Sequence, residues 1–112
     1  MPIFEPGTIV KVPFPYVDKD RRHHRPALVL SKGVGPSDGL FWALMITAAE
    51  NDSWPGDVKI TGSRDVTGLP ILSIVRTAKV ATVEVKEASL LGKCPAPVWR
   101  KVLAELEAAG VR

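Results

Sequence analysis

The sequence has little cysteine, little histidine and no long apolar run. Its single cysteine, Cys94, excludes an intrachain disulfide and any Cys-x-x-Cys motif, so we expect a small packing residue there. No apolar run approaches the roughly 20 residues of a membrane-spanning helix. The first residues also lack the cationic start and long apolar core of a secretory signal. These absences predict a cytoplasmic protein with no membrane partner.

A strong excess of one charge sign is also absent. The chain has 15 Lys and Arg residues and 12 Asp and Glu residues, for a net charge of +3. This mild excess permits a nucleic-acid partner without requiring one. Apolar residues make up 46% and charged residues 24% of the 112 positions, which is typical of a globular protein and not of a disordered one. The length predicts one domain spanning residues 1–112.

The first two thirds of the chain favour β-strands. Short segments rich in β-branched and apolar residues, separated by Pro- and Gly-containing turns, occur at 8–12, 27–31, 41–48, 57–60, 73–83 and 88–93. After Pro97 the period changes, and Val98, Val102 and Leu106 form one apolar stripe before Gly110, which predicts an amphipathic helix. Together they predict a mainly β (α+β) fold, a small curved or partly closed barrel with a C-terminal helix packed on it.

The two histidines do not predict a metal site. His23 and His24 are adjacent, and neighbouring side chains of an extended chain point to opposite faces. The nearby carboxylates, Asp18 and Asp20, lie among cations. Metal sites usually gather three or four ligands in a closed geometry. We therefore expect no metal ligand and no cofactor.

A basic stretch, "DKDRRHHRPALVL", runs from Asp18 into an apolar segment. For Lys19, Arg21 and His23 we expect a solvated loop between two strands, because runs of charge usually face water. Arg25 differs from them because it precedes Pro26, which favours an extended backbone at the start of a buried strand.

A register argument gives Arg25 a partner. Segments 27–31 and 41–48 are expected to form an antiparallel hairpin across the turn-rich "KGVGPSDG". If Ser31 lies opposite Phe41, paired residue numbers add up to about 72, and Arg25 lies across from Thr47. A slip of one residue would destroy this pairing. In this register a guanidinium and a hydroxyl converge at one end of two strands, which suits a phosphate.

Several segments together resemble the MazF/PemK family of bacterial toxin-antitoxin ribonucleases. They are "PGTIVKVPFPYVD", "RPALVLS", "LMITA", "PGDVKI", "TGLPILSIVRTAKVATV" and "LLGK", in this order. The resemblance implies an SH3-like β-barrel of antiparallel strands with a C-terminal α-helix, usually a homodimer. It implies metal-independent cleavage of single-stranded RNA, with Arg25 and Thr47 as the catalytic pair. It also implies inhibition by a separate antitoxin chain whose tail lies across the RNA groove.

The resemblance also suggests residues that hold RNA. The stretch from Arg76 through Thr77 to Lys79 matches a basic stretch of the family, and the loop that contains Arg21, Arg22 and His24 borders the RNA groove in relatives. Arg76 and Lys79 are three positions apart, so we expect them on opposite faces of a strand with Arg76 in the groove. Lys79 is then either an RNA contact or an exposed charge that deters edge pairing.

The tryptophans are assigned by their surroundings. Trp54 lies in the loop "ENDSWPGD". The sequence leaves two roles open for it: stacking on a base of the RNA, or covering an edge of the core. Trp42 and Trp99 lie in apolar segments and are expected in the core.

Cleavage without a metal would use the 2′-hydroxyl of the RNA as nucleophile. In-line attack on the adjacent phosphorus leaves a 2′,3′-cyclic phosphate and a 5′-hydroxyl. Arg25 suits stabilisation of the phosphorane, and Thr47 suits donation to a non-bridging oxygen. His24 has the chemistry of a base, but its position next to Arg25 argues against a shared phosphate.

Two other functions remain open from the sequence. The same barrel can be a non-catalytic module that binds RNA, DNA or a protein, since SH3-like barrels host many functions. It can also be a structural or regulatory partner that acts through a dimer face. The sequence specifies neither the RNA motif nor the antitoxin.

Overall fold

The computed structural model describes residues 4–15 and 22–111, without the side chains of residues 14, 15, 22 and 23. In this part of the chain the elements follow in the order β1 (Thr8–Pro15), β2 (Arg22–Val29), η1 (Pro36–Asp38), β3 (Leu40–Ala48), β4 (Asp57–Ile60), α1 (Arg64–Thr67), β5 (Ser73–Glu84), η2 (Val85–Glu87), β6 (Ser89–Lys93) and α2 (Ala96–Ala108). The six segments predicted as strands and the predicted helix are all present. The short α1 was not predicted.

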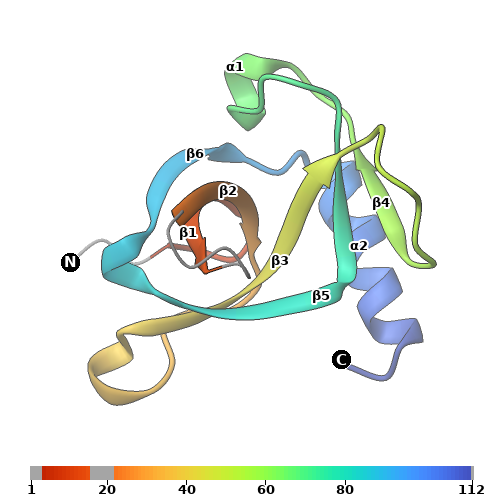
Figure 1. Ribbon diagram of the computed structural model, residues 1–112. Helices are drawn as coiled ribbons and strands as arrows, with labels where there is room; N and C mark the ends of the chain where they lie inside the picture. Colours follow the sequence, from red (N-terminus) through yellow and green to blue (C-terminus); the bar gives the residue numbers. More distant parts are fainter. Residues whose placement is uncertain (1–3, 16–21, 112) are drawn as a thin grey trace.

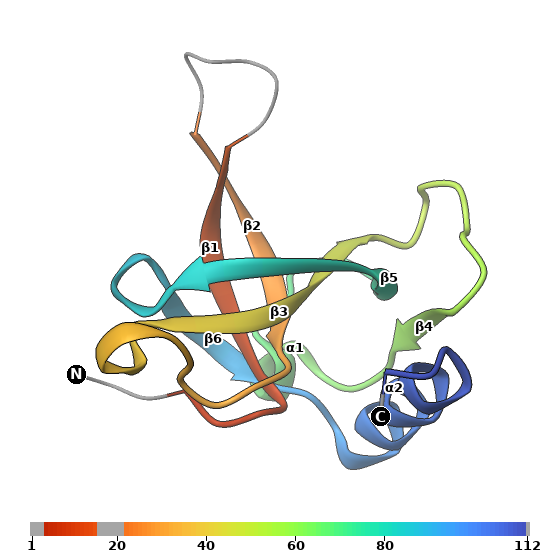
Figure 2. The ribbon, with the colours of Figure 1, turned by 90° about the horizontal axis from the view of Figure 1, so that it is seen from below.

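The strands form one sheet in the order β4-β5-β3-β2-β1-β6, and every pair is antiparallel. The sheet curls around β1 and β2 into a half-barrel, with α2 on its outside (Figure 1). Figure 2 shows β1 and β2 extending together beyond the other strands. The predicted mainly β class, with a curved antiparallel sheet and a C-terminal helix, is confirmed.

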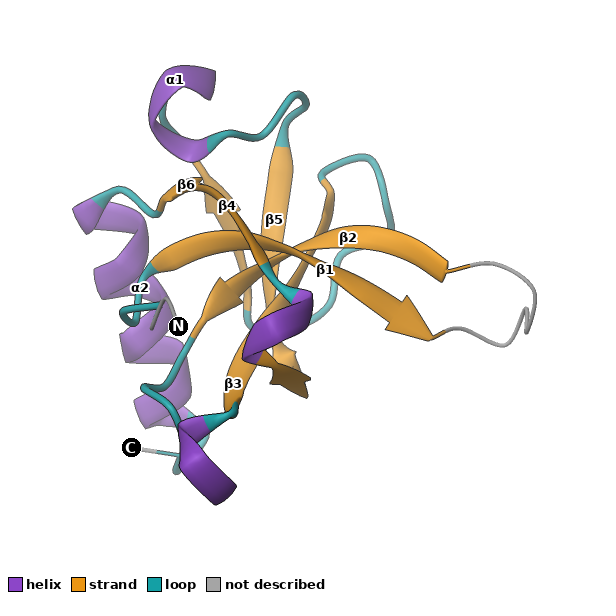
Figure 3. Ribbon diagram, turned by 90° about the vertical axis from the view of Figure 1, so that its left-hand side faces the viewer, coloured by secondary structure: helices purple, strands orange, loops and turns teal. Residues whose placement is uncertain are grey.

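The two faces of the sheet carry separate apolar clusters. Leu28, Leu44 and Ile46 belong to one cluster, which α2 covers with Val98, Val102 and Leu106. Ala27, Ala43 and Met45 belong to the other cluster, inside the curl of the sheet. This division follows from strand geometry, because successive side chains point to opposite faces. Figure 3 shows α2 along one side of the sheet, and the end of β1 and the start of β2 on the other.

An irregularity in β5 changes which side chains share a face. Leu44 of β3 pairs with Val80 of β5, but the next residue, Met45, pairs with Arg76. Residues 77–79 are therefore extra on the β5 side. Because this number is odd, the alternation of β5 is reversed across the bulge, and Arg76 and Lys79 lie on the same face. The prediction that they face opposite sides was wrong.

Two smaller expectations have different outcomes. Trp42 was expected in the core but is 47% exposed, whereas Trp99 packs against the cluster under α2. Cys94 is partly buried against that cluster, as expected of a packing residue, and burial raises the pKa of its thiol to about 11. None of the described helices is long and apolar enough to span a membrane.

The packing of α2 gives a stability prediction. Leu106 is 1% exposed, so Leu106→Ala should lower the free energy of unfolding by about 2–5 kcal/mol, measured by urea denaturation. Leu72 carries the same side chain in a loop and is 80% exposed, so Leu72→Ala is the matched control and should change it by less than about 0.5 kcal/mol. Equal losses in the two variants would contradict the packing of α2.

Candidate active site

Arg25 of β2 and Thr47 of β3 line the same two cavities. The register between their strands is the predicted one, since Ala27 pairs with Met45, Leu28 with Leu44 and Val29 with Ala43. This ladder ends before Arg25 and Thr47. Each lies two residues beyond the last pair, so alternation places both on the face of Ala27 and Met45.

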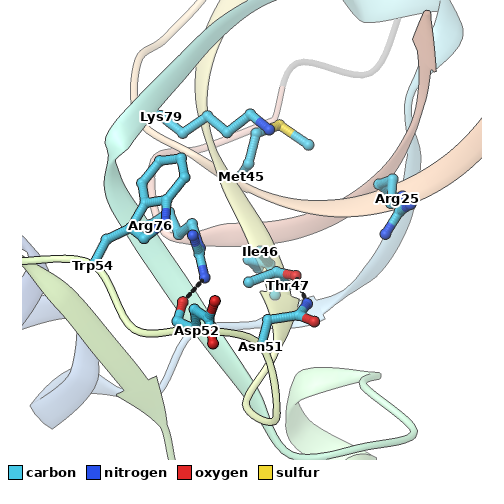
Figure 4. A pocket seen from close by; sticks show the side chains of 9 residues that line it. All are labelled: Arg25, Met45, Ile46, Thr47, Asn51, Asp52, Trp54, Arg76 and Lys79. Atoms are coloured by element: carbon cyan, nitrogen blue, oxygen red, sulfur yellow. Dashed lines mark hydrogen bonds between the residues drawn. The ribbon is translucent and has the colours of Figure 1, made fainter. Parts of the chain in front are cut away.

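The first cavity has a volume of about 300 Å³ and opens where β2, β3, β5 and the β3–β4 loop meet (Figure 4). Its lining combines cations with hydrogen-bonding and aromatic groups, as nucleic-acid sites do. The lining residues are Arg25, Met45, Ile46, Thr47, Asn51, Asp52, Trp54, Arg76 and Lys79. The structure thus brings together four of the residues predicted from the sequence with Arg25.

The second cavity, also about 300 Å³, adjoins the first at Arg25 and Thr47 and is more apolar. It shares Arg25, Ile46, Thr47 and Asn51 with the first cavity. The other lining residues are His24, Pro26, Ala48, Leu69, Pro70, Ile71 and Ser73. A phosphate at the shared residues would therefore lie next to both cavities.

Thr47 has a partner that the sequence did not reveal. The side-chain amide of Asn51 donates a hydrogen bond of 2.5 Å to Thr47 Oγ1. The backbone N–H of Asn51 donates to the carbonyl of Ala48 at 3.1 Å, so a turn directly after β3 returns Asn51 toward the strand. A hydroxyl has one proton to donate. Because the amide of Asn51 is the donor in this bond, the Thr47 proton is directed away from it and can be donated to a ligand in the cavity.

Arg76 is buried in a network with the β3–β4 loop, residues 49–56. It is 7% exposed, and its guanidinium lies over the Trp54 ring, 4.1 Å from the ring centroid. Arg76 Nη2 donates to the carbonyl of Asp52 and lies 3.9 Å from Asp57 Oδ2. The same carboxylate oxygen accepts a hydrogen bond of 2.8 Å from the backbone N–H of Trp54. Trp54 lies outside regular structure, as predicted, and is 43% exposed.

Thr77 lies in the bulge and is not among the residues that line the two cavities. Its hydroxyl donates a hydrogen bond of 2.8 Å to the carbonyl of Gly56, at the end of the β3–β4 loop. This contact explains why residue 56 is a glycine. Gly56 has a φ of +91°, and a Cβ there would lie 2.7 Å from Thr77 Oγ1.

The remaining predicted residues lie at the β1–β2 end. His24 is exposed in β2 and lines the second cavity. Arg22 and His23 belong to β2 and not to a loop, and their side chains are not described. Lys19 and Arg21 lie outside the described residues. Among the residues that are described, no three His, Cys, Asp or Glu side chains come together as a metal site would need.

Comparison with known proteins gives one family. Residues 5–109 match the family model of the PemK-like, MazF-like toxin of type II toxin-antitoxin systems. No curated protein matches the sequence significantly.

Solved structures of similar fold span the whole chain. MazF from Deinococcus radiodurans has a TM-score of 0.74 and 21% identity, and the match covers 100% of both chains. A MazE–MazF complex from the same organism has a TM-score of 0.72 and 23% identity over 97% of this chain and 96% of that chain. An endoribonuclease in complex with its cognate antitoxin from a mycobacterial species has a TM-score of 0.67 and 18% identity over 96% and 95%.

The close approach at Gly56 gives a prediction about the loop. Gly56→Ala should lower the free energy of unfolding by more than about 1 kcal/mol, because the new Cβ meets the Thr77 hydroxyl at a positive φ. Gly110 also has a positive φ, +81°, but a Cβ added there would have no atom within 4 Å, so Gly110→Ala reports the backbone cost alone. Thermal or urea unfolding measures both, and an equal cost would contradict the contact with Thr77.

Proposed function

Because this chain belongs to the family of PemK-like, MazF-like toxins of type II toxin-antitoxin systems, we propose that it is a metal-independent endoribonuclease that cleaves single-stranded RNA at selected sequences. The observation that carries this proposal is the placement of Arg25 and Thr47 on the wall shared by two cavities. A scissile phosphate at that wall has a nucleoside on each side, and each nucleoside has a cavity to enter.

The proposed reaction is an attack of the RNA 2′-hydroxyl on the adjacent phosphorus. The P–O5′ bond breaks as the new P–O2′ bond forms, which gives a 2′,3′-cyclic phosphate and a 5′-hydroxyl. The Arg25 guanidinium stabilises the charge that builds up on the phosphorane oxygens. The Thr47 hydroxyl donates to a non-bridging oxygen, because the hydrogen bond from the Asn51 amide directs its proton away from Asn51.

The first cavity supplies the proposed grip on the substrate. Trp54 offers the exposed part of its ring to a base, while Arg76 covers part of the indole. Lys79 lines the same cavity and offers a positive charge to a neighbouring phosphate. The resemblance adds Arg21, Arg22 and His24 as proposed RNA-binding residues. Arg76 and Thr77, which it also suggested, contact the β3–β4 loop through Asp52 and Gly56.

The proposed partners follow from family membership. The inhibitor is a cognate antitoxin on a separate chain, which blocks the RNA groove. The active form is a homodimer, and the site of action is the cytoplasm, where the RNA is. The solved MazE–MazF complex and the solved endoribonuclease–antitoxin complex give such an inhibitor a structural precedent.

The direct test is incubation of the purified protein with mixed-sequence single-stranded RNA in EDTA. We expect discrete fragments with 2′,3′-cyclic phosphate and 5′-hydroxyl ends, identified by mass spectrometry. Arg25→Ala and Thr47→Val should each lower the cleavage rate by about 100- to 1,000-fold, the usual effect of losing one donor from a pre-organised site. Lys32→Gln removes an exposed charge that lines neither cavity and is the control.

The alternative is a non-catalytic SH3-like module that binds nucleic acid or protein. RNA binding without cleavage, by a correctly folded wild-type chain, would establish that function and overturn the proposal. Cleavage that survives Arg25→Ala would remove Arg25 from the mechanism.

His24 tests whether a histidine accepts the proton of the 2′-hydroxyl. His24→Gln keeps a hydrogen-bonding group for RNA but cannot relay a proton. Alternation along β2 directs Arg25 toward the face of Met45 and His24 toward the other face, so we expect a change in rate of less than about threefold. A collapse of single-turnover cleavage, with unchanged RNA binding, would instead make His24 the base.

A further inference from the structure

We propose that Arg76 is a positioning residue: its buried guanidinium holds the β3–β4 loop so that Asn51 reaches the Thr47 hydroxyl. This inference rests on the proposed function for its consequence in catalysis, and on the described contacts for its structural part. It replaces the direct RNA contact that the sequence suggested for Arg76.

The burial of Arg76 argues against a role as a phosphate ligand. Only 7% of the residue is exposed, and its guanidinium is packed against the Trp54 ring. One of its terminal nitrogens already donates to the Asp52 carbonyl and lies beside the Asp57 carboxylate. Although Arg76 lines the first cavity, little of its surface is left for a phosphate. Lys79, which is half-buried in the wall of the same cavity, is the better phosphate ligand.

Every described contact of the Arg76 side chain is with the β3–β4 loop or with the first residue of β4. Asp52 and Trp54 belong to the loop, and Asp57 begins β4. Asp57 strengthens the same attachment, because it accepts the backbone N–H of Trp54 at 2.8 Å. The guanidinium therefore ties the middle of the loop to β5, with the directional fork that an arginine provides.

The chemistry of this network favours a geometric role over a stabilising one. Arg76 Nε and Asp57 Oδ1 are buried without a hydrogen-bond partner in the described part of the chain. A buried ion pair that leaves polar atoms unsatisfied recovers little of the free energy lost on desolvation. The Arg76–Asp57 pair does, however, fix the orientation of the β3–β4 loop relative to β5.

The loop transmits that direction to the catalytic hydroxyl. Asp52, whose carbonyl Arg76 binds, directly follows Asn51, whose amide binds Thr47. Figure 4 shows these two contacts side by side on the cavity wall. If Arg76 releases Asp52, Asn51 loses its restraint and the Thr47 proton is free to turn away from the substrate. A displacement of about 1 Å in such a group can cost about 100-fold in rate.

A double-mutant cycle on the whole chain separates this mechanism from direct RNA contact. Arg76→Gln and Asn51→Ala should each lower kcat, by up to about 100-fold, with a small change in KM. The double variant should fall no further than the worse single variant, because both changes break one chain of contacts. Multiplied losses in the double variant would overturn the proposal.

The salt dependence of RNA binding is the second measurement, made with a 2′-O-methyl RNA that cannot be cleaved. Lys79→Gln should reduce the log–log salt slope by about 0.7, the value for one phosphate contact on a single strand. Arg76→Gln should leave the slope at the wild-type value. A reduction equal to that of Lys79→Gln would make Arg76 a phosphate ligand and overturn the proposal.

A third measurement does not depend on catalysis. In a Trp42→Phe/Trp99→Phe chain, Trp54 is the only tryptophan left. Arg76→Gln should shift its emission to longer wavelength and increase its quenching by acrylamide, since the loop loses its attachment. Unchanged emission and quenching would overturn the structural part. If the wild-type chain cuts no RNA, the proposed function fails, while this measurement still decides whether Arg76 holds the loop.

Removal of Arg76 alone leaves the Asp57 carboxylate buried without its cation, which can prevent folding. The variant Arg76→Gln/Asp57→Asn removes both charges and keeps an acceptor for the Trp54 N–H. We expect it to fold, as judged by circular dichroism, and to show the same losses in kcat and in Trp54 protection. Wild-type kcat in this folded variant would overturn the proposal.

Discussion

Strand β3 sets the geometry of the whole site, because it is hydrogen-bonded to β2 on one side and to β5 on the other. Side chains alternate along a strand, so one face of β3 carries Met45 and Thr47 toward Arg25 of one neighbour and Arg76 of the other. The bulge in β5 then returns Lys79 to the same face. A shift of one residue in either ladder would turn these groups toward α2.

The site is held in two different ways. Arg25 pairs with Val12 of β1 and Thr47 with Ile74 of β5, so the sheet fixes the direction of both side chains just beyond the end of the β2–β3 ladder. Asn51 lies in a loop without strand pairing. There the buried guanidinium of Arg76 holds the backbone through Asp52 and so fixes the direction of Asn51. A polar anchor of this kind adds little stability, but unlike an apolar contact it fixes orientation as well as distance. The position of the Thr47 hydroxyl therefore depends on both the curled sheet and the β3–β4 loop.

The sequence predicts the parts of the site that depend on local pattern. With Ser31 placed opposite Phe41 across the turn, paired residue numbers add up to about 72, so the pairing of β2 with β3 followed from counting. The bulge gave no such signal, since residues 73–83 read as an uninterrupted strand, and the relation of Arg76 to Lys79 was therefore mistaken. Trp42 was wrongly expected in the core, because the apolar residues beside it in the sequence do not show which part of the sheet α2 covers. The role of Asn51 was missed because its position is fixed through its neighbour Asp52, which binds Arg76. Arg76 lies far along the chain, so no local pattern shows this contact.

One face of the sheet packs against α2, and the other carries Arg25 and Thr47. The side chains that α2 buries, Val98, Val102 and Leu106, all belong to the cluster on the face away from Arg25, and no α2 residue lines either cavity of the site. Substitutions at these three α2 positions can therefore change the melting temperature without replacing any residue that lines the two cavities. Thermal stability and the proposed activity can then change independently of each other.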